Sequence, residues 1–229
     1  FIDLFLDAES DEGDVEFGET GEVSKKMHPE EIVSQCIIFL LAGFDTTSNA
    51  LGYTSYFLAR NPAIQERLRE EIDAVCPDGN VTYDQLADLP YTEAVIKETL
   101  RHFPLGSMVV NRECIKPCVI KGVSFEKGDM VQTDTWSMHM DPDVWGADAA
   151  EFRPERWLED NERQRTAFQA FGEGPRMCIG VRLAIIEEKL MLAKLLHRFT
   201  LERSAHTDEL VLGGSFTVSP ARVCVTLKE

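Results

Sequence analysis

The stretch from Phe171 to Gly180 places a single cysteine among loop-forming residues, and it is the first place where the sequence could do chemistry. It reads FGEGPRMCIG, and a strongly helical sequence follows at once. The free N–H groups and the dipole at the start of a helix favour a thiolate at Cys178. Four roles suit such a cysteine: a buried structural side chain, a zinc ligand, a nucleophile, or a thiolate ligand to haem iron.

These roles differ in the partners that they require. A zinc ion needs further ligands, and no companion cysteine or histidine lies close by in the sequence. A nucleophile needs a histidine base. The sequence has five histidines, none within a recognisable signature: His28, His102, His139, His197 and His206. The residues alone leave the role of Cys178 open.

A second group of polar residues interrupts an apolar helix-forming stretch, LAGFDTTS, at positions 41–48. Asp45 and Thr46 bring a carboxylate and a hydroxyl into surroundings where their burial is unfavourable unless they are hydrogen-bonded or used. Gly43 costs about 1 kcal/mol relative to alanine within a helix. The segment is therefore either a kinked helix with threonines bonded back to carbonyls, or a helix against a ligand with an acid–hydroxyl pair that relays protons.

Glu98 and Arg101 form a third pair, three residues apart within KETLR on a predicted helix. Apolar residues precede them at helical spacing, so the pair shares the apolar stripe of that helix. An exposed pair would contribute a few tenths of a kcal/mol at most. A buried pair would be a structural lock that needs further hydrogen-bond partners.

The elements that must position these residues follow from periodicity and from helix and turn signals. We expect the following order: an acidic loop and the end of a preceding helix over 1–27, a long helix over 28–60, helices over 62–104, a small sheet over 107–136, an irregular segment over 141–180, a helix over 181–199 and terminal strands over 200–229. The middle third of the long helix is apolar on every face and should be buried. The order predicts a mostly α fold with a minor β part.

Composition narrows the class of protein. The 23 basic and 40 acidic residues give a net charge of -17, which opposes nucleic-acid binding because phosphates require a basic surface. The most apolar run, CIIFLLAGF, is far shorter than the roughly 20 residues that span a bilayer. The chain begins abruptly within FIDLFLDA and without a methionine, so we expect a piece of a longer protein.

The six cysteines show no spacing typical of a disulfide framework. Cys114 and Cys118 form a C-x3-C pair, but no second Cys or His pair completes a tetrahedral zinc site. We expect both to lie in strands as small apolar side chains.

Taken together, the motifs resemble those of the cytochrome P450 family. FGEGPRMCIG is similar to its haem-binding signature, F-x-x-G-x-R-x-C-x-G, at every fixed position. AGFDTT resembles its oxygen-activation motif, ETLR its E-x-x-R motif, and FRPERW its P-E-R-F element. The four motifs follow the family's order over nearly the whole chain. The resemblance, which is to the animal microsomal type, implies the C-terminal half of that fold: long central helix, small sheet, irregular meander, cysteine-ligand loop, last helix and terminal hairpin.

The resemblance assigns roles to particular residues. It implies that Cys178 is the axial thiolate of haem iron, that Arg112 and Arg176 pair with the haem propionates, and that Asp45 and Thr46 deliver protons. The other residues implied to surround the haem are Phe171, which shields the sulfur, Gly172, Gly174, Gly180 and Ala42. Those implied to form a structural lock are Glu98, Arg101 and Arg156. Those implied to line the substrate pocket are Ala42, Gly43, Met108 and Phe216.

The activity implied is a monooxygenase that inserts one oxygen atom from O2 into a small apolar organic substrate. Electrons would come from NADPH through a flavoprotein reductase, with cytochrome b5 as a further donor. Four basic residues of the last helix could dock that reductase or form a plain solvated face: Arg182, Lys189, Lys194 and Arg198. The implied location is the cytosolic face of the endoplasmic reticulum membrane, held by an N-terminal anchor outside this chain, with a mitochondrial location as the alternative.

Two features depart from the family pattern. Trp157 replaces the usual phenylalanine, and the chain is about half the family's usual length. Two alternatives to a monooxygenase are a peroxide isomerase or dehydratase on the same fold and an incomplete fragment without catalytic activity. The intact pair Asp45 and Thr46 argues against the isomerase or dehydratase.

Overall fold

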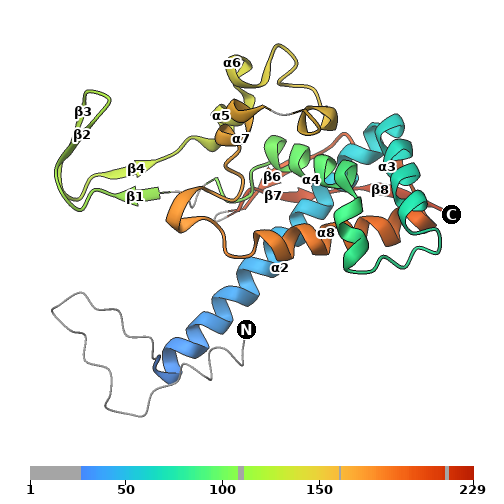
Figure 1. Cartoon of the computed structure of the whole chain (residues 1–229), viewed down its shortest axis with the longest axis horizontal. Helices are drawn as coiled ribbons and strands as arrows, with labels where there is room; N and C mark the ends of the chain where they lie inside the picture. The colour runs from blue at the N-terminus through green and yellow to red at the C-terminus, as the bar shows by residue number, and fades with distance from the viewer. Residues whose placement is uncertain (1–26, 108–110, 160, 215–216) are drawn as a thin grey trace. The chain divides into compact units, whose positions relative to one another are not determined.

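The computed structural model describes residues 27–107, 111–159, 161–214 and 217–229. It is mostly helical with small two-stranded antiparallel sheets, so the predicted fold class is confirmed (Figure 1). The chain forms two compact units, Phe1–Asp45 and Thr46–Glu229. The acidic loop expected over 1–27 lies, apart from its last residue, outside the described residues. Within the described part of the chain, every helix is too short or too polar to cross a membrane.

Helix α2, Pro29–Arg60, is 32 residues long, and the boundary between the two units falls inside it. It begins with a proline at its first position and two acidic residues in its first turn, which suits the positive end of the helix dipole. The carboxylate of Glu31 accepts a hydrogen bond from the backbone N–H of His28 at 2.8 Å. The helix ends at Arg60, directly before Asn61 and Pro62.

The apolar stretch of α2 within the first unit is exposed, so the prediction that the middle of this helix is buried is wrong for that stretch. Leu40 is 71% exposed and Phe44 is 75% exposed, whereas Ile32 is buried. A helix that is apolar on all sides needs neighbouring chain on several sides to cover it. The described residues of the first unit, 27–45, comprise little more than this part of α2 itself.

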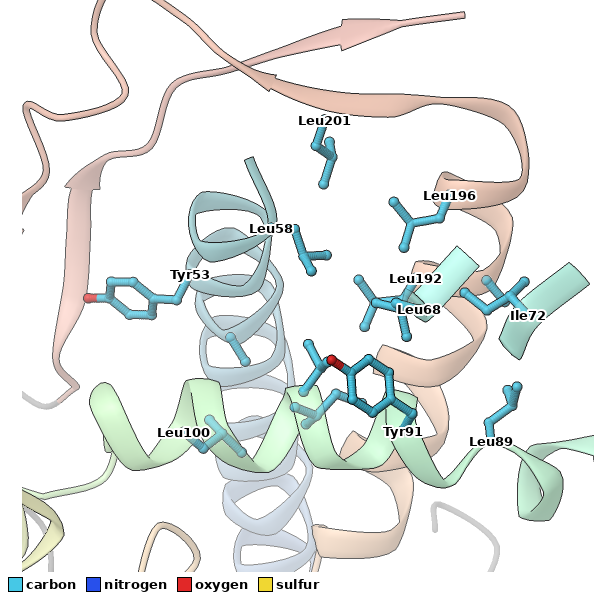
Figure 2. Packing of buried hydrophobic residues seen from close by; sticks show 14 of the residues in the cluster. Tyr53, Leu58, Leu68, Ile72, Leu89, Tyr91, Leu100, Leu192, Leu196 and Leu201 are labelled. Atoms are coloured by element: carbon cyan, nitrogen blue, oxygen red, sulfur yellow. The ribbon is translucent and has the colours of Figure 1, made fainter. Parts of the chain in front are cut away.

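The core of the second unit lies between the last turns of α2 and three other helices, α3 (Pro62–Val75), α4 (Pro90–His102) and α8 (Val181–Arg198). Figure 2 shows Leu58, Leu68 and Leu192 close to one another in this core, and none of the three has exposed surface. Each such side chain contributes about 1.5–3 kcal/mol through its burial. This packing holds α8, and with it the cysteine loop directly before it, against α4.

The start of α4 is set by a side chain from α3. The two carboxylate oxygens of Glu71 accept hydrogen bonds from the backbone N–H groups of Tyr91 and Thr92, at 2.7 and 2.8 Å, and from the Thr92 hydroxyl at 2.7 Å. These donors are among the first N–H groups of α4, which no carbonyl of the same helix can satisfy, and the negative charge faces the positive end of the helix. The side chain of Glu71 thus fixes the residue at which α4 begins.

Among the residues that the structure describes, the strands form four separate antiparallel pairs. Their bounds are β1 Asn111–Glu113 with β4 Met130–Gln132, β2 Cys118–Ile120 with β3 Val123–Phe125, β5 Thr200–Arg203 with β8 Val225–Lys228, and β6 Val211–Gly213 with β7 Ser219–Arg222. The single sheet expected over 107–136 is thus two pairs, and it ends early. The side chain of Asp134 caps the helix α5, Thr135–Met140, which replaces the last predicted strand residues.

The segment expected to be irregular, 141–180, contains short helices. They are α6 Pro142–Trp145, the 3-10 helix η2 Pro154–Trp157, α7 Glu162–Ala167 and the 3-10 helix η3 Gly174–Arg176. A further 3-10 helix, η1 Asp84–Asp88, precedes α4. Prolines at the first turns of α6, η2 and η3 start these elements, which are too short to give a periodic sequence signal.

Candidate functional site

The cysteine loop is closed on itself by backbone hydrogen bonds. The N–H of Cys178 donates to the carbonyl of Phe171 at 2.9 Å, and the N–H of Met177 donates to that of Gly174 at 3.0 Å. The helix begins directly behind the loop, since the N–H of Ala184 donates to the carbonyl of Gly180 at 2.9 Å. Cys178 is exposed and carries a free thiol. The loop therefore presents its one thiol outward at the positive end of an 18-residue helix.

Glycines shape this loop in two ways. Gly172 and Gly174 have φ values of +73° and +75°, a conformation that residues with a Cβ rarely adopt. Gly180 acts through space, because a Cβ at that position would lie 3.8 Å from the sulfur of Cys178. The absence of a side chain at Gly180 leaves room beside the thiol.

The surroundings of Cys178 separate the roles that the sequence left open. Exposure argues against a buried structural cysteine. No cluster of three or more potential metal-ligating side chains occurs among the residues that the structure describes. Four of the five histidines bond to other side chains or carbonyls: His102, His139, His197 and His206. The fifth, His28, bonds through its backbone to Glu31. Cys178 is thus an exposed free thiol that an external ligand can reach.

Glu98, Arg101 and Arg156 come together as a buried ion-pair network. The Nε and Nη2 atoms of Arg101 donate to the two carboxylate oxygens of Glu98, both at 2.9 Å. Nε of Arg156, from η2, donates to the same carboxylate at 3.1 Å. All three side chains have 0% exposure. We call these three residues the lock, because they join α4 to η2.

The remaining donors of the lock are satisfied by backbone carbonyls. Arg101 donates to the carbonyls of His139 and Glu151, at 2.7 and 3.2 Å, and Arg156 donates to those of Trp145 and Asp148, at 3.1 and 3.2 Å. A buried ion pair is tolerated only when such extra hydrogen bonds replace lost hydration. The network therefore fixes the path of the chain from α5 to η2 as well as the helices themselves.

The charge of Glu98 is strongly favoured in this environment. Burial by itself would raise its pKa, but the His102 ring 3.7 Å away, hydrogen bonds from Arg101, and the positive charges of Arg101 and Arg156 outweigh burial. The pKa of Glu98 therefore lies far below the usual range of a carboxyl group. The carboxylate stays ionised wherever the chain is folded at ordinary pH.

Trp157 is hydrogen-bonded to the lock, a contact that the sequence did not predict. Its indole N–H donates to the second carboxylate oxygen of Glu98 at 2.9 Å, and the backbone N–H of Arg153 donates to the first, also at 2.9 Å. Trp157 stands where the family pattern has a phenylalanine. A phenylalanine has no N–H, so the polar end of the indole ring was the signal available in the sequence.

His139 connects the lock to the cysteine loop, and sequence reasoning missed this as well. Its Nε2 accepts a hydrogen bond from the backbone N–H of Gln169 at 2.9 Å, and its Nδ1 lies 3.1 Å from the carbonyl of Arg101. Gln169 in turn accepts from the N–H of Gly172 at 3.0 Å. Burial lowers the pKa of His139 to about 4, so the ring is neutral at pH 7, with its proton on Nδ1.

The other residues with predicted roles lie on several elements. Asp45 is exposed and closes the first unit, whereas Thr46 is half-buried and opens the second. Ala42 and Gly43 are exposed in α2. Arg112 lies exposed on β1. The described residues do not include the remaining two predicted pocket residues, Met108 and Phe216.

One of the four basic residues considered for reductase docking is ruled out by its burial. Lys189 is 4% exposed, and its ammonium group donates to the carbonyl of Leu86 and to the carboxylate of Glu93, both at 2.9 Å. It joins α8 to the segment before α4 and cannot meet a partner protein. Arg182, Lys194 and Arg198 are exposed on the same helix.

The domain is mostly helical, and its exposed cysteine lies between a glycine-rich loop and the last long helix. These are the features of a haem-thiolate class of protein. The family model described as Cytochrome P450 matches residues 1–225. The chain is 48% identical over 238 residues to cytochrome P450 CYP13A5, and 47% identical over 239 residues to cytochrome P450 CYP13A3, both of Caenorhabditis elegans. These alignments cover 99% and 100% of the chain and 46% of each relative. The chain belongs to the cytochrome P450 family, and it spans about half the length of the curated relatives it matches.

The family implies a haem group, and the cysteine loop has the chemistry to hold one. A thiol donor is exposed, and the side of the sulfur next to Gly180 is clear. Met177 and Ile179, on either side of Cys178, are 52% and 76% exposed, and such apolar surface suits a flat apolar ring. Arg176 is exposed two residues before the thiol and suits a carboxylate of that ring.

Proposed function

We propose that this chain is the haem-binding half of a monooxygenase that inserts one oxygen atom from O2 into a small apolar organic substrate. The observation that carries the proposal is the exposed thiol of Cys178, held at the start of α8 by a loop closed on itself. Family membership supports a monooxygenase in general terms. The activity belongs to the longer protein, of which the chain corresponds to about half.

The residues of the chain would divide the work of holding the haem. Cys178 would ligate the iron through its sulfur, and the positive end of α8 would favour the thiolate form. Arg176 and Arg112 would pair with the propionates, and the glycines of the loop would allow close approach of the ring. When bound, haem supplies the reductive activation of O2 that oxygen insertion requires.

Proton delivery is proposed for Asp45 and Thr46. The Thr46 hydroxyl both donates and accepts hydrogen bonds, so it can pass a proton from a donor to the site of oxygen chemistry. The carboxylate of Asp45, next in the chain, can take up protons from solvent because it is exposed. Ala42 and Gly43, one turn earlier on α2, add little side-chain bulk and so leave space for a substrate.

Electrons are proposed to come from NADPH through a flavoprotein reductase, with cytochrome b5 as a further donor. Arg182, Lys194 and Arg198 offer exposed positive charge on α8 for an acidic partner surface. We place the longer protein at the cytosolic face of the endoplasmic reticulum membrane, by likeness to the microsomal type, with a mitochondrial location as the alternative.

The ligand assignment can be tested by spectroscopy on the full chain and on the longer protein, each reconstituted with haem. Reduction and addition of carbon monoxide should give the red-shifted Soret band of thiolate-ligated haem. Cys178→Ala should abolish that band, while Cys118→Ala, which removes another exposed cysteine, should leave it unchanged. A band that survives Cys178→Ala refutes the assignment.

The reaction class can be tested by turnover of the longer protein. Product formation should require both NADPH and a reductase, and Thr46→Ala should lower the product formed per NADPH consumed. Rearrangement of an organic peroxide without reductase would instead indicate an isomerase or dehydratase. Failure of the longer protein to retain haem would indicate a protein without this catalytic activity.

A further inference from the structure

Cys114 and Cys118 lie at two fixed points of one ribbon of strands. Cys114 directly follows β1, where its N–H donates to the carbonyl of Asp129 at 2.8 Å and its carbonyl accepts from the N–H of Gly128 at 2.7 Å. Cys118 begins β2 and pairs with Phe125. Figure 1 shows the pair β2–β3 at the tip of the ribbon that β1 and β4 begin. Only a three-residue bend, 115–117, separates the two cysteines.

The thiol of Cys114 is turned toward that bend and toward the second cysteine. Its Sγ donates to the carbonyl of Lys116 at 3.1 Å, which places the sulfur over the bend instead of away from it. Burial, and next the neighbouring Cys118, raise the pKa of Cys114, which accords with this direction of the thiol. Cys118 itself is exposed. Strand pairing thus holds two free thiols on either side of one three-residue bend, and the thiol of Cys114 is directed over that bend.

We propose that Cys114 and Cys118 are a reversible oxidation site, which forms an intramolecular disulfide by exchange with a small-molecule disulfide such as glutathione disulfide. The exposed Cys118 thiolate attacks one sulfur of the oxidant, so that one glutathione thiolate leaves and a mixed disulfide forms. Cys114 then loses its proton to solvent and attacks the sulfur of Cys118, and the second glutathione leaves. Two protein thiols are oxidised, and one glutathione disulfide is reduced to two glutathione molecules.

The roles of the two cysteines follow from their surroundings. Cys118 meets the oxidant first because it is exposed, and the exposed Lys116 beside it attracts the carboxylates of glutathione. Cys114 is half-buried, and its raised pKa leaves less of it as thiolate, so it reacts after Cys118. This order is that of an attacking cysteine and a resolving cysteine.

The oxidation lies next to a residue of the proposed haem site but does not depend on that proposal. Arg112 is two residues before Cys114 on the same ribbon. A disulfide would tie the end of β1 to the start of β2 and so restrict the strand that carries Arg112. The disulfide can be detected in the chain without haem, so its failure and the failure of the haem assignment are distinguishable.

The test uses the full chain equilibrated with mixtures of reduced and oxidised glutathione, then quenched with acid, alkylated and analysed by mass spectrometry. We expect a species that carries two fewer alkyl groups than the fully reduced chain, a peptide map that links Cys114 to Cys118, and full reversal by a dithiol reductant. Absence of this linkage under every mixture, or linkage of either residue to a different cysteine instead, would overturn the proposal.

Single variants test the order of attack. Cys114→Ser should trap one glutathione on Cys118, and Cys118→Ser should react more slowly, by at least several-fold, at the remaining thiol. Cys224→Ser, which changes a half-buried cysteine on the C-terminal segment, should form the same disulfide as the parent chain. Equal rates of glutathione addition in the two variants would contradict the assigned roles of Cys118 and Cys114.

Discussion

The hydrogen bond from Trp157 to Glu98 offers a sharp test of the lock. Trp157→Phe removes one N–H and keeps most of the aromatic ring. The carboxylate then keeps four of the five donors described above, from Arg101, Arg153 and Arg156. A hydrogen bond to a charged group contributes about 1.5–3 kcal/mol, against about 0.5–1.5 kcal/mol for a neutral pair. We therefore expect the free energy of unfolding to fall by about 2 kcal/mol.

A double-mutant cycle separates the charge from the ring. Glu98→Gln keeps the shape of the side chain and removes its charge, so in that background the Trp157→Phe change should cost only about 1 kcal/mol. The coupling between the two positions should then be about 1 kcal/mol. Urea unfolding of the full chain, followed by far-ultraviolet circular dichroism, measures each free energy without relying on tryptophan fluorescence.

Trp136→Phe is the matched control. Trp136 is also half-buried, and its ring contacts Phe103 instead of the lock. Its replacement should lower stability by the same amount whether residue 98 is Glu or Gln. Equal costs of Trp157→Phe in the two backgrounds would refute the idea that the indole N–H stabilises the buried carboxylate.

Three further changes test other parts of the structure. Glu98→Gln should lower the free energy of unfolding by about 3–5 kcal/mol, since it leaves two buried guanidinium groups without their counterion. Folding lowers the pKa of Glu98, so the ionised side chain contributes to stability above the usual carboxyl pKa of about 4.3, and this contribution is lost as pH falls toward the pKa in the folded chain. The midpoint of urea unfolding in acid should therefore depend less on pH in Glu98→Gln than in the parent chain. Burial, and next the charge of Glu187, raise the pKa of Glu188 to about 8, so the contribution of this residue to stability falls as pH rises from about 4.3 to 8. Glu188→Gln should therefore stabilise the chain by up to a few kcal/mol at pH 7.5 and have little effect at pH near 4. Unchanged midpoints at both pH values would contradict that assignment. Gly79→Ala should lower the free energy of unfolding by about 1 kcal/mol or more, because φ at this position is +70° and a Cβ there would overlap the His197 ring. Gly43→Ala is the control: a Cβ there meets no atom within 4 Å, so this change should be neutral or stabilising in thermal or urea unfolding.

The cysteine loop and the long helices were predictable because their signals are local. Phe171 to Gly180 carries its glycines, arginine and cysteine within ten residues, and α8 begins directly behind it. The start of α2 at Pro29 and its end at Arg60 are marked by proline and by acidic residues within one turn. In such stretches the backbone conformation follows from neighbouring residues, so the sequence alone is informative.

Contacts across the chain were not predictable in the same way. Trp157 and His139 reach their partners over 59 and 30 residues of sequence, and no local pattern announces a hydrogen bond at that separation. The exposure of Leu40 and Phe44 is a related case, because apolar composition predicts a preference for burial but not whether other chain is present to provide it. Lys189 is the converse, a charged residue whose burial depends on Glu93 from another helix.

The lock also has a consequence for the order in which the second unit folds. Its hydrogen bonds connect Glu98 to residues 55 to 59 positions later in the chain, so the intervening segment must be closed into a loop before the carboxylate meets its partners. A partly assembled network would leave ionised groups in a poorly solvated interior, which is less favourable than either full assembly or full exposure. The lock should therefore form in a single cooperative step. The most protected amide hydrogens of α4 and η2 should therefore report the same opening free energy in hydrogen exchange, as one unit of local opening.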